Sequence, residues 1–252
     1  MLKGAVSLLA RLDASRHSKD VDLAWREGPD RAEAERAFRL AADRDLGDFF
    51  YIGLSAAVEL ADGKGVRIAV ASDLGGRLYS SFSVDIVAGV AMVGSPDRVG
   101  ALVPLDVPGL VNPGYWAYPV IDHVADKVAA CLETRVRQSG QVVHSTRFKD
   151  LVDLVVIGLS ETLEAGALGV AIRSELARRS IDVPPEFAVP SSSWAPGYET
   201  RAKEASGLGE LRYFDAAIAF VKSIVDHVLA GTARDSWDPA RRCWVEPMSS
   251  RS

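Results

Sequence analysis

The sequence predicts a mixed α/β (α+β) protein, with a sheet domain over residues 1–118 followed by a helical domain over residues 119–252. Between residues 20 and 87, short runs of alternating apolar residues are separated by glycine-containing turns, the pattern of strands with tight connections. From residue 120 onward the apolar residues recur with the period of amphipathic helices. Residues 89–118 between them are rich in Gly, Pro, Val and Asp, which breaks regular structure.

In the sheet domain we expect two helices and four strands. The turn Gly75-Gly76 joins two of the strands, and the short connections favour a mixed sheet that is antiparallel in this part. The predicted helices span residues 4–12 and 31–43, and the predicted strands span residues 20–25, 49–60, 66–72 and 77–87.

In the helical domain the apolar stripes predict four helices. Thr146 is a suitable N-cap for the second helix, and His227 stands at the end of the last one, where the helix dipole favours a surface histidine. His144 falls in a polar loop, and no pattern supplies it with a catalytic partner. The predicted helices span residues 120–135, 147–163, 165–180 and 211–229, with a connector over residues 181–193.

The composition is that of an ordinary globular protein. The 252 residues are 48% hydrophobic and 25% charged, and the net charge of −5 argues against a protein that coats nucleic acid, without excluding a local basic groove. Cys131 and Cys243 have no metal-ligand spacing, and Cys131 is predicted to be a reduced core thiol. The chain has no signal-peptide pattern and no apolar run of membrane-spanning length, so we expect a soluble cytoplasmic protein.

The candidate catalytic stretch contains two aspartates, Asp20 and Asp22, preceded by Arg16 and Ser18. Residues i and i+2 of a strand point to the same face, so both carboxylates can be directed at one point. Such a pair repels itself unless a cation lies between the carboxylates, and oxygen-only ligands favour Mg²⁺ or Mn²⁺. A solvated strand end is the simpler interpretation that this short pattern leaves open.

A third carboxylate, Asp85, lies in the apolar strand Phe82-Ser83-Val84-Asp85-Ile86-Val87. An aspartate is unfavourable in a strand built for burial unless it has a partner. Sharing a metal ion with Asp20 and Asp22 would supply that partner.

Several further motifs occur in a fixed order around these aspartates. They are Lys3-Gly4-Ala5-Val6-Ser7-Leu8-Leu9, Asp122-His123-Val124-Ala125-Asp126-Lys127-Val128-Ala129-Ala130 and Thr146-Arg147-Phe148-Lys149-Asp150-Leu151-Val152-Asp153-Leu154. Together with the aspartate segments, this set resembles the AbiEii/AbiGii-type nucleotidyltransferase toxin family, whose catalytic domain has a DNA-polymerase-beta-like fold. The resemblance extends from about residue 2 to residue 163 and, more loosely, to Ser193-Trp194.

The resemblance implies metal-dependent transfer of a nucleotidyl group from an NTP to an acceptor. It places one Mg²⁺ (or Mn²⁺) at Asp20 and Asp22 and a second one shared with Asp85, with Lys127 completing the catalytic set. A helical domain of the family type closes the active-site cleft. The substrate-binding positions implied in this way are Gly4, Ser7, Arg16, Ser18, Arg77, Arg147, Lys149 and Asp150.

Structural interpretations stand beside these roles. Lys127 at the edge of an apolar stripe can be a lysine that extends to the surface, and Arg77 can be an exposed hairpin charge. Asp150 and Asp153 suit the first turns of a helix, but this explanation covers Arg147 and Lys149 less well. The family usually has Gly-Gly or Gly-Ser where this chain has Gly4-Ala5, and the added Cβ is tolerable only if residue 5 has a negative φ.

The expected role is that of the toxin of a toxin–antitoxin pair, with an NTP as substrate, tRNA or another RNA as acceptor, a cognate antitoxin as partner and no membrane association. Two alternatives remain open. One is a catalytically silent nucleotide- or protein-binding module of the same fold. The other is a nucleotidyltransferase that modifies a small molecule or a protein hydroxyl, which the acidic composition favours slightly over tRNA.

Overall fold

The computed structural model describes residues 1–12, 15, 20–60, 63, 65–100, 114–136, 142–145, 147–189 and 191–245. The chain divides into two compact units. Unit 1 comprises Met1–Arg11, His17–Ala91 and Pro96–Tyr118, and unit 2 comprises Leu12–Arg16, Met92–Ser95 and Pro119–Ser252.

Unit 1 is built on one mixed sheet with the strand order β3-β5-β6-β2-β1-β8-β7, and β4 also pairs with β5. The pairs β2–β6 and β1–β8 are parallel, and the other pairs are antiparallel. The strands are β1 (Leu2–Lys3), β2 (Asp20–Ala24), β3 (Phe50–Leu54), β4 (Val58–Glu59), β5 (Gly65–Leu74), β6 (Arg77–Val87), β7 (Asp97–Val99) and β8 (Tyr115–Ala117).

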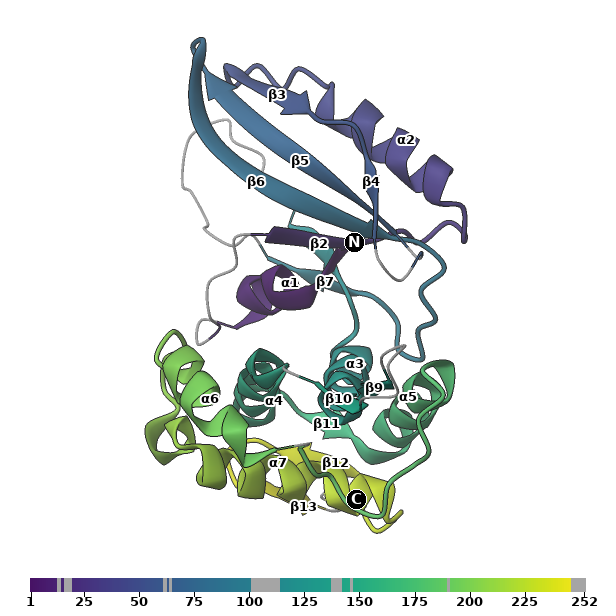
Figure 1. The fold of residues 1–252 in the computed structure, drawn as a ribbon, viewed down its shortest axis with the longest axis vertical. Coiled ribbons are helices and arrows are strands. Elements are labelled where there is room, and N and C mark those ends of the chain that lie inside the picture. Colours follow the sequence, from purple (N-terminus) through teal and green to yellow (C-terminus); the bar gives the residue numbers. More distant parts are fainter. Residues whose placement is uncertain are drawn as a thin grey trace, which may run out of the picture. The chain divides into compact units, whose positions relative to one another are not determined.

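The two faces of this sheet differ in chemistry. Helix α2 (Arg31–Ala42) covers one face (Figure 1). It packs through Ala34 and Phe38 onto Ile68, Val84 and other apolar residues of the central strands. Helix α2 begins where the Asp30 carboxylate accepts hydrogen bonds from the N–H groups of its first turn. Helix α1 (Gly4–Arg11) follows β1 directly and contacts β2. Because side chains alternate along a strand, the residues between the core positions of β2, β5 and β6 lie on the face opposite α2.

Unit 2 is a helical assembly in which α3 packs against α4 and α5, and α4 also packs against α6 and α7. Trp237 is fully buried, and its indole N–H donates to the Gly158 carbonyl of α4 at 2.7 Å. The helices are α3 (Val120–Leu132), α4 (Phe148–Ser160), α5 (Ala165–Arg178), α6 (Ala195–Ala202) and α7 (Phe214–Leu229), with 3₁₀ turns η1 (Ser192–Trp194) and η2 (Gly209–Arg212). The strands are β9 (Thr134–Val136), β10 (Val142–His144), β11 (Leu163–Glu164), β12 (Ser236–Asp238) and β13 (Cys243–Val245).

The predicted mixed sheet and helices are confirmed, with local corrections. The strand predicted over residues 49–60 is two strands, because the chain leaves the ladder at residues 55–57. The loop predicted before Thr146 contains a hairpin, β9–β10, and the predicted last helix begins at Phe214, after a separate 3₁₀ turn. Thr146 itself lies outside the described residues.

Two smaller predictions are also confirmed. Cys131 is a buried, unbridged thiol, and burial raises its pKa well above the usual value. His227 is exposed at the end of α7, with Nδ1 3.1 Å from the Thr232 hydroxyl. Within the described part of the chain, no helix combines the length and hydropathy needed to cross a membrane.

Candidate active site

Four neighbouring strands place two carboxylates between two basic residues in one row across the sheet. Strand β1 pairs with β2 so that Lys3 lies opposite Asp22, and β2 pairs with β6 so that Asp22 lies opposite Asp85. Strand β5 pairs with β6 so that Arg67 lies opposite Asp85. Directly paired residues share a face of the sheet, so the order across this face is Arg67, Asp85, Asp22 and Lys3. We call these four residues the charged row.

Asp20 belongs to the same face because it lies two residues before Asp22 in β2. It pairs with Ser83 and is exposed, whereas Asp22 and Asp85 are half-buried. The alternate residues of the same strand, Val21 and Leu23, belong to the apolar cluster on the α2 side. The alternation of the sequence therefore gathers three carboxylates on the face opposite the core.

Arg67 holds the third carboxylate through two hydrogen bonds. Its Nε donates to Oδ1 of Asp85 and its Nη2 donates to Oδ2, both at 2.6 Å. The Asp85 side chain is 15% exposed, while the Arg67 side chain is 53% exposed. The pKa of the Arg67 guanidinium is raised, first by the hydrogen bonds and charge of Asp85 and then by the charges of Asp20 and Asp22. Arg67 therefore lies in the field of all three carboxylates.

Gly4 joins β1 to α1 and lies against the carboxylate of Asp22. Its φ of +59° is in the left-handed region, and a Cβ added there would lie 1.9 Å from Asp22 Oδ2. Glycine is required at this position both for the backbone conformation and for the space that the carboxylate takes. Ala5 is the first buried residue of α1 and does not have a positive φ, so the Gly4-Ala5 pair fits this turn.

The other predicted substrate-binding residues of unit 1 lie in different places. Ser7 is fully buried in α1, and its hydroxyl has no hydrogen-bond partner among the described residues. Arg77 is exposed at the start of β6, eight residues and roughly 26 Å along the strand from Asp85. Arg16 and Ser18 lie outside the described residues.

Unit 2 contains a second charged group, in which one lysine and two aspartates are buried. Lys127 of α3 donates from Nζ to Asp153 Oδ2 at 2.6 Å and to Asp150 Oδ1 at 3.3 Å, both on α4. Arg147 Nε donates to the other oxygen of Asp150 at 2.5 Å. We call Lys127, Arg147, Asp150 and Asp153 the buried ion cluster. The side chain of Lys127 is 8% exposed, which is a correction to its interpretation as a lysine extending to the surface.

Charge compensation explains how these groups remain ionised. Burial alone would raise the pKa of Asp150, but the ammonium of Lys127 and the guanidinium of Arg147 lower it below the usual carboxyl value. Burial would likewise lower the pKa of Arg147, and the Asp150 carboxylate raises it. Lys149 lies beside these residues in the sequence but is exposed. Near the start of α4, the Trp194 indole donates to the Ser145 carbonyl at 2.9 Å.

The charged row together with Asp20 fits a divalent cation in its donor chemistry. Three carboxylates on one face offer the oxygen ligands and the negative charge that Mg²⁺ or Mn²⁺ prefers. As the side chains are placed, however, no group of three His, Cys, Asp or Glu residues in the described part of the chain is close enough to hold a metal ion. Both oxygens of Asp85 are bound to Arg67 instead.

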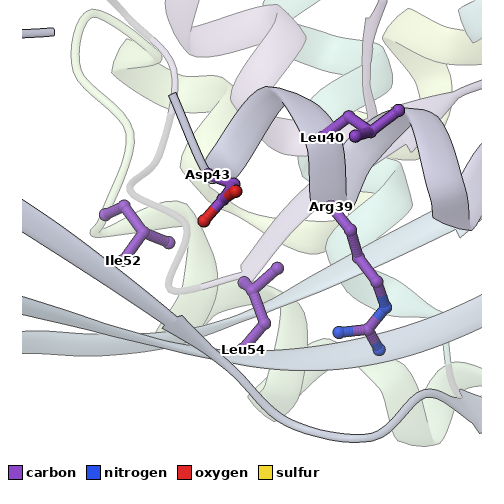
Figure 2. A pocket seen from close by; sticks show the side chains of 5 residues that line it. All are labelled: Arg39, Leu40, Asp43, Ile52 and Leu54. Carbon is purple, nitrogen blue, oxygen red and sulfur yellow. The ribbon is translucent and has the colours of Figure 1, made fainter. Parts of the chain in front are cut away.

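A separate pocket of about 300 Å³ lies between α2 and β3 (Figure 2). Its apolar wall comes from Leu40, Ile52 and Leu54, and its polar rim from Arg39 and Asp43. Leu54 pairs with Val70, which faces the core, so this pocket is on the α2 side of the sheet. It is therefore not part of the carboxylate face.

Comparison with known proteins identifies the class of fold. The chain is similar in structure to MenT4, a nucleotidyltransferase toxin from Mycobacterium tuberculosis, with a TM-score of 0.50 and 17% sequence identity over 92% of this chain and 84% of that chain. At this identity the similarity shows a nucleotidyltransferase-type fold. A search of curated proteins gave no match.

The sequence identifies the family. Residues 1–220 match the profile of the nucleotidyl transferase AbiEii toxin family, a type IV toxin–antitoxin system. Because the match covers most of the chain, this protein belongs to the AbiEii family of nucleotidyltransferase toxins. The family predicted from the order of the sequence motifs is confirmed.

Sequence reasoning missed two members of the charged row and one partner of Lys127, Asp153. Arg67 and Lys3 were not assigned roles, although each lies in a segment with a clear pattern. Asp153 was explained by the helix dipole, yet its spacing of three residues from Asp150 places both on one side of α4 and indicates a shared partner.

Proposed function

We propose that this protein transfers a nucleotidyl group from an NTP to the 3′ end of an RNA such as tRNA, with Mg²⁺ or Mn²⁺ bound at Asp20, Asp22 and Asp85. The observation that carries the proposal is the gathering of these three carboxylates on the face of the sheet opposite the core. The proposal also places the protein in the cytoplasm as the toxin of a toxin–antitoxin pair, with a cognate antitoxin as partner.

The residues of unit 1 would have the following roles. Asp20 and Asp22 would be the principal ligands of the cation, and Asp85 would complete the site. The cation, when bound, would neutralise the triphosphate and lower the pKa of an attacking hydroxyl. Gly4 supports this assignment, because it lets the start of α1 approach Asp22, and helix starts favour anions such as phosphate.

The remaining predicted residues would contribute positive charge for phosphate binding. Arg147 and Lys149 at the start of α4 retain exposed side chains, which supports such a role. The ammonium of Lys127 is already bound by Asp150 and Asp153, so its contribution would require an exchange of partners. Asp150 would hold the two basic side chains in position.

The test is an assay with each labelled NTP, Mg²⁺ and total cell RNA, with purified tRNA, protein and small-molecule acceptors in parallel. We expect label in RNA for the wild-type protein and none when EDTA replaces Mg²⁺. Asp22→Asn should lose the transfer, whereas Asp182→Asn, which changes an exposed carboxylate in a connector of unit 2, should retain it. Transfer to protein or a small molecule would replace the acceptor proposal, and no transfer to any acceptor would support a silent binding module.

The toxin role has its own test. Expression of the wild-type chain should arrest growth, and expression of Asp22→Asn at the same level should not. Growth arrest by both forms would separate the toxicity from nucleotidyl transfer.

A further inference from the structure

Arg67 occupies the position at Asp85 that a cation would take. Its guanidinium binds both carboxylate oxygens, and the pair lies in the charged row beside Asp22. A bidentate arginine provides the same charge compensation for a carboxylate as a metal ion, with two directed hydrogen bonds in place of metal–oxygen bonds. The sheet therefore contains its own counter-cation at the third carboxylate.

Formal charges indicate what happens when a divalent cation enters. The charged row together with Asp20 has a formal charge of −1. A divalent cation added with Arg67 in place changes this to +1, whereas the same cation with Arg67 released gives 0. Keeping the guanidinium and a metal ion at the same carboxylate also places two cations close together, which is electrostatically unfavourable.

Because the side chain of Arg67 is exposed, its release from Asp85 costs little free energy. The side chain is 53% exposed, so the guanidinium can leave Asp85 and become hydrated without an unpaired buried charge. Lys127 differs in this respect, because its side chain is only 8% exposed and would have to leave its carboxylates inside the protein. The Asp85 carboxylate, at 15% exposure, is the member of the pair that needs a cation.

We propose that Arg67 is a positioning residue that holds Asp85 in the metal-free protein and competes with a divalent cation for that carboxylate. The consequence is that the metal affinity of the site is set partly by an internal arginine. The proposal rests on the proposed function insofar as Asp20, Asp22 and Asp85 form the cation site.

The experiment measures Mn²⁺ binding to the full-length protein by calorimetry and electron paramagnetic resonance at low ionic strength, where the ion pair is least screened. Arg67→Met keeps much of the length of the side chain and removes the charge. We expect it to bind Mn²⁺ about tenfold more tightly than the wild type, since a charge-assisted hydrogen bond corresponds to roughly that factor in an equilibrium. Arg67→Lys should give an intermediate affinity.

A matched control separates this effect from a general loss of positive charge. Arg31 of α2 forms an ion pair with Glu59 of β4 and also has an exposed side chain. Its pairing partner lies on a different strand from the three carboxylates, and Arg31→Met should leave the Mn²⁺ affinity at the wild-type value.

Thermal melting supplies a second readout. In EDTA, Arg67→Met should melt below the wild type, because it leaves the three carboxylates with less compensation. Saturating Mn²⁺ should raise the melting temperature of Arg67→Met more than that of the wild type.

Each outcome has a distinct meaning. Weaker Mn²⁺ binding by Arg67→Met would show that Arg67 supports the metal site, and equal binding would show that it is unrelated to the site; both overturn the competition. If binding is equal in these two proteins but lost in Asp22→Asn, the proposed metal site stands and only the role of Arg67 fails. If none of the proteins binds Mn²⁺, the metal site itself fails, and the competition fails with it.

Discussion

In unit 1 the carboxylate of Asp85 is bound to an arginine whose side chain is 53% exposed, whereas in unit 2 the carboxylate of Asp153 is bound to a lysine that is 8% exposed. Both are short ion pairs with a nearest distance of 2.6 Å, yet their surroundings differ. The charged row and Asp20 have more carboxylates than cations. The buried ion cluster has two carboxylates and two cations.

This difference indicates that the charged row and Asp20 are suited to binding a ligand, whereas the buried ion cluster stabilises the fold. A group of residues with more carboxylates than cations favours the binding of a further cation. A balanced cluster inside a helical unit has its charge satisfied already, and removing one member leaves an unpaired buried ion. Removing a carboxylate should therefore have opposite effects on stability in the two regions.

The largest expected effect is on activity in unit 1. Asp20→Ala, Asp22→Ala and Asp85→Ala should each lower the rate of nucleotidyl transfer by ~10³-fold or more, by comparison with the loss of a charge-stabilising group in other active sites. Folding should be unchanged or slightly improved for Asp20 and Asp22, because removing one carboxylate relieves repulsion. Single-turnover rates beside thermal melting test this, and a folded Asp22→Ala protein with near-normal transfer would remove the metal assignment.

The next effect is on stability in unit 2. Lys127→Met should lower the free energy of unfolding by about 3–5 kcal/mol, because it leaves Asp150 and Asp153 buried without their shared ammonium. Urea unfolding monitored by circular dichroism measures this change. Lys222→Met, which removes a surface pair with Glu186, is the matched control and should change little. If Lys127→Met were as stable as the control, the cluster would not hold the helices together.

The pH dependence of stability should reveal the contribution of the same cluster to the free energy of unfolding. The pKa of Asp150 is lowered in the folded protein from its ordinary value of 3.8, so its carboxylate stabilises the fold above pH 3.8. This contribution is lost as the pH falls from 3.8 through the lower folded-state pKa. The difference in unfolding free energy between the wild type and Asp150→Asn should therefore be largest near neutral pH and shrink in acid.

A second carboxylate in unit 2 provides a comparison for this titration. The pKa of Glu175 is lowered to about 2 by Arg178 and Arg179, which outweigh the effect of burial. Glu175→Gln should show the same sign, with its contribution lost between pH 4.5 and about pH 2. A difference that grows toward acid for Asp150→Asn would mean that its pKa is raised rather than lowered.

The sequence was informative where a residue's role depends on local spacing. The i, i+2 spacing of Asp20 and Asp22 was enough to place both carboxylates on one face of a strand, and the family resemblance added Asp85 to them. The cap at Asp30 and the hairpin at Gly75-Gly76 likewise follow from local chemistry. These elements depend on few long-range contacts.

The partner of Asp85 could not be predicted from the same rules. Leu74 pairs with Arg77 beside the turn, and a hairpin continued without interruption would pair Arg67 with Val84. An irregularity between Ser72 and Asp73 shifts the register by one residue, so that Arg67 reaches Asp85. Nothing in the local sequence marks this bulge. Because of this shift, Val84 pairs with the core residue Ile68 while the chain still turns at Gly75-Gly76.

The smallest expected effect concerns Arg147, the member of the buried ion cluster that has an exposed side chain, and its exposed neighbour Lys149. Lys149→Ala should change the free energy of unfolding by no more than about 0.5 kcal/mol, as for other surface substitutions. Arg147→Ala should cost more, because Asp150 loses one of its two cations. If both residues bind phosphate, each alanine variant should weaken the affinity for NTP or RNA, and Arg147→Lys should only partly restore it because a point charge does not replace a bidentate fork. Calorimetric titration measures the affinity and thermal melting measures the stability, so together they distinguish phosphate binding from a purely structural role. Unchanged affinity in Lys149→Ala and Arg147→Ala would confine ligand binding to other residues and leave Arg147 as a counter-ion of Asp150.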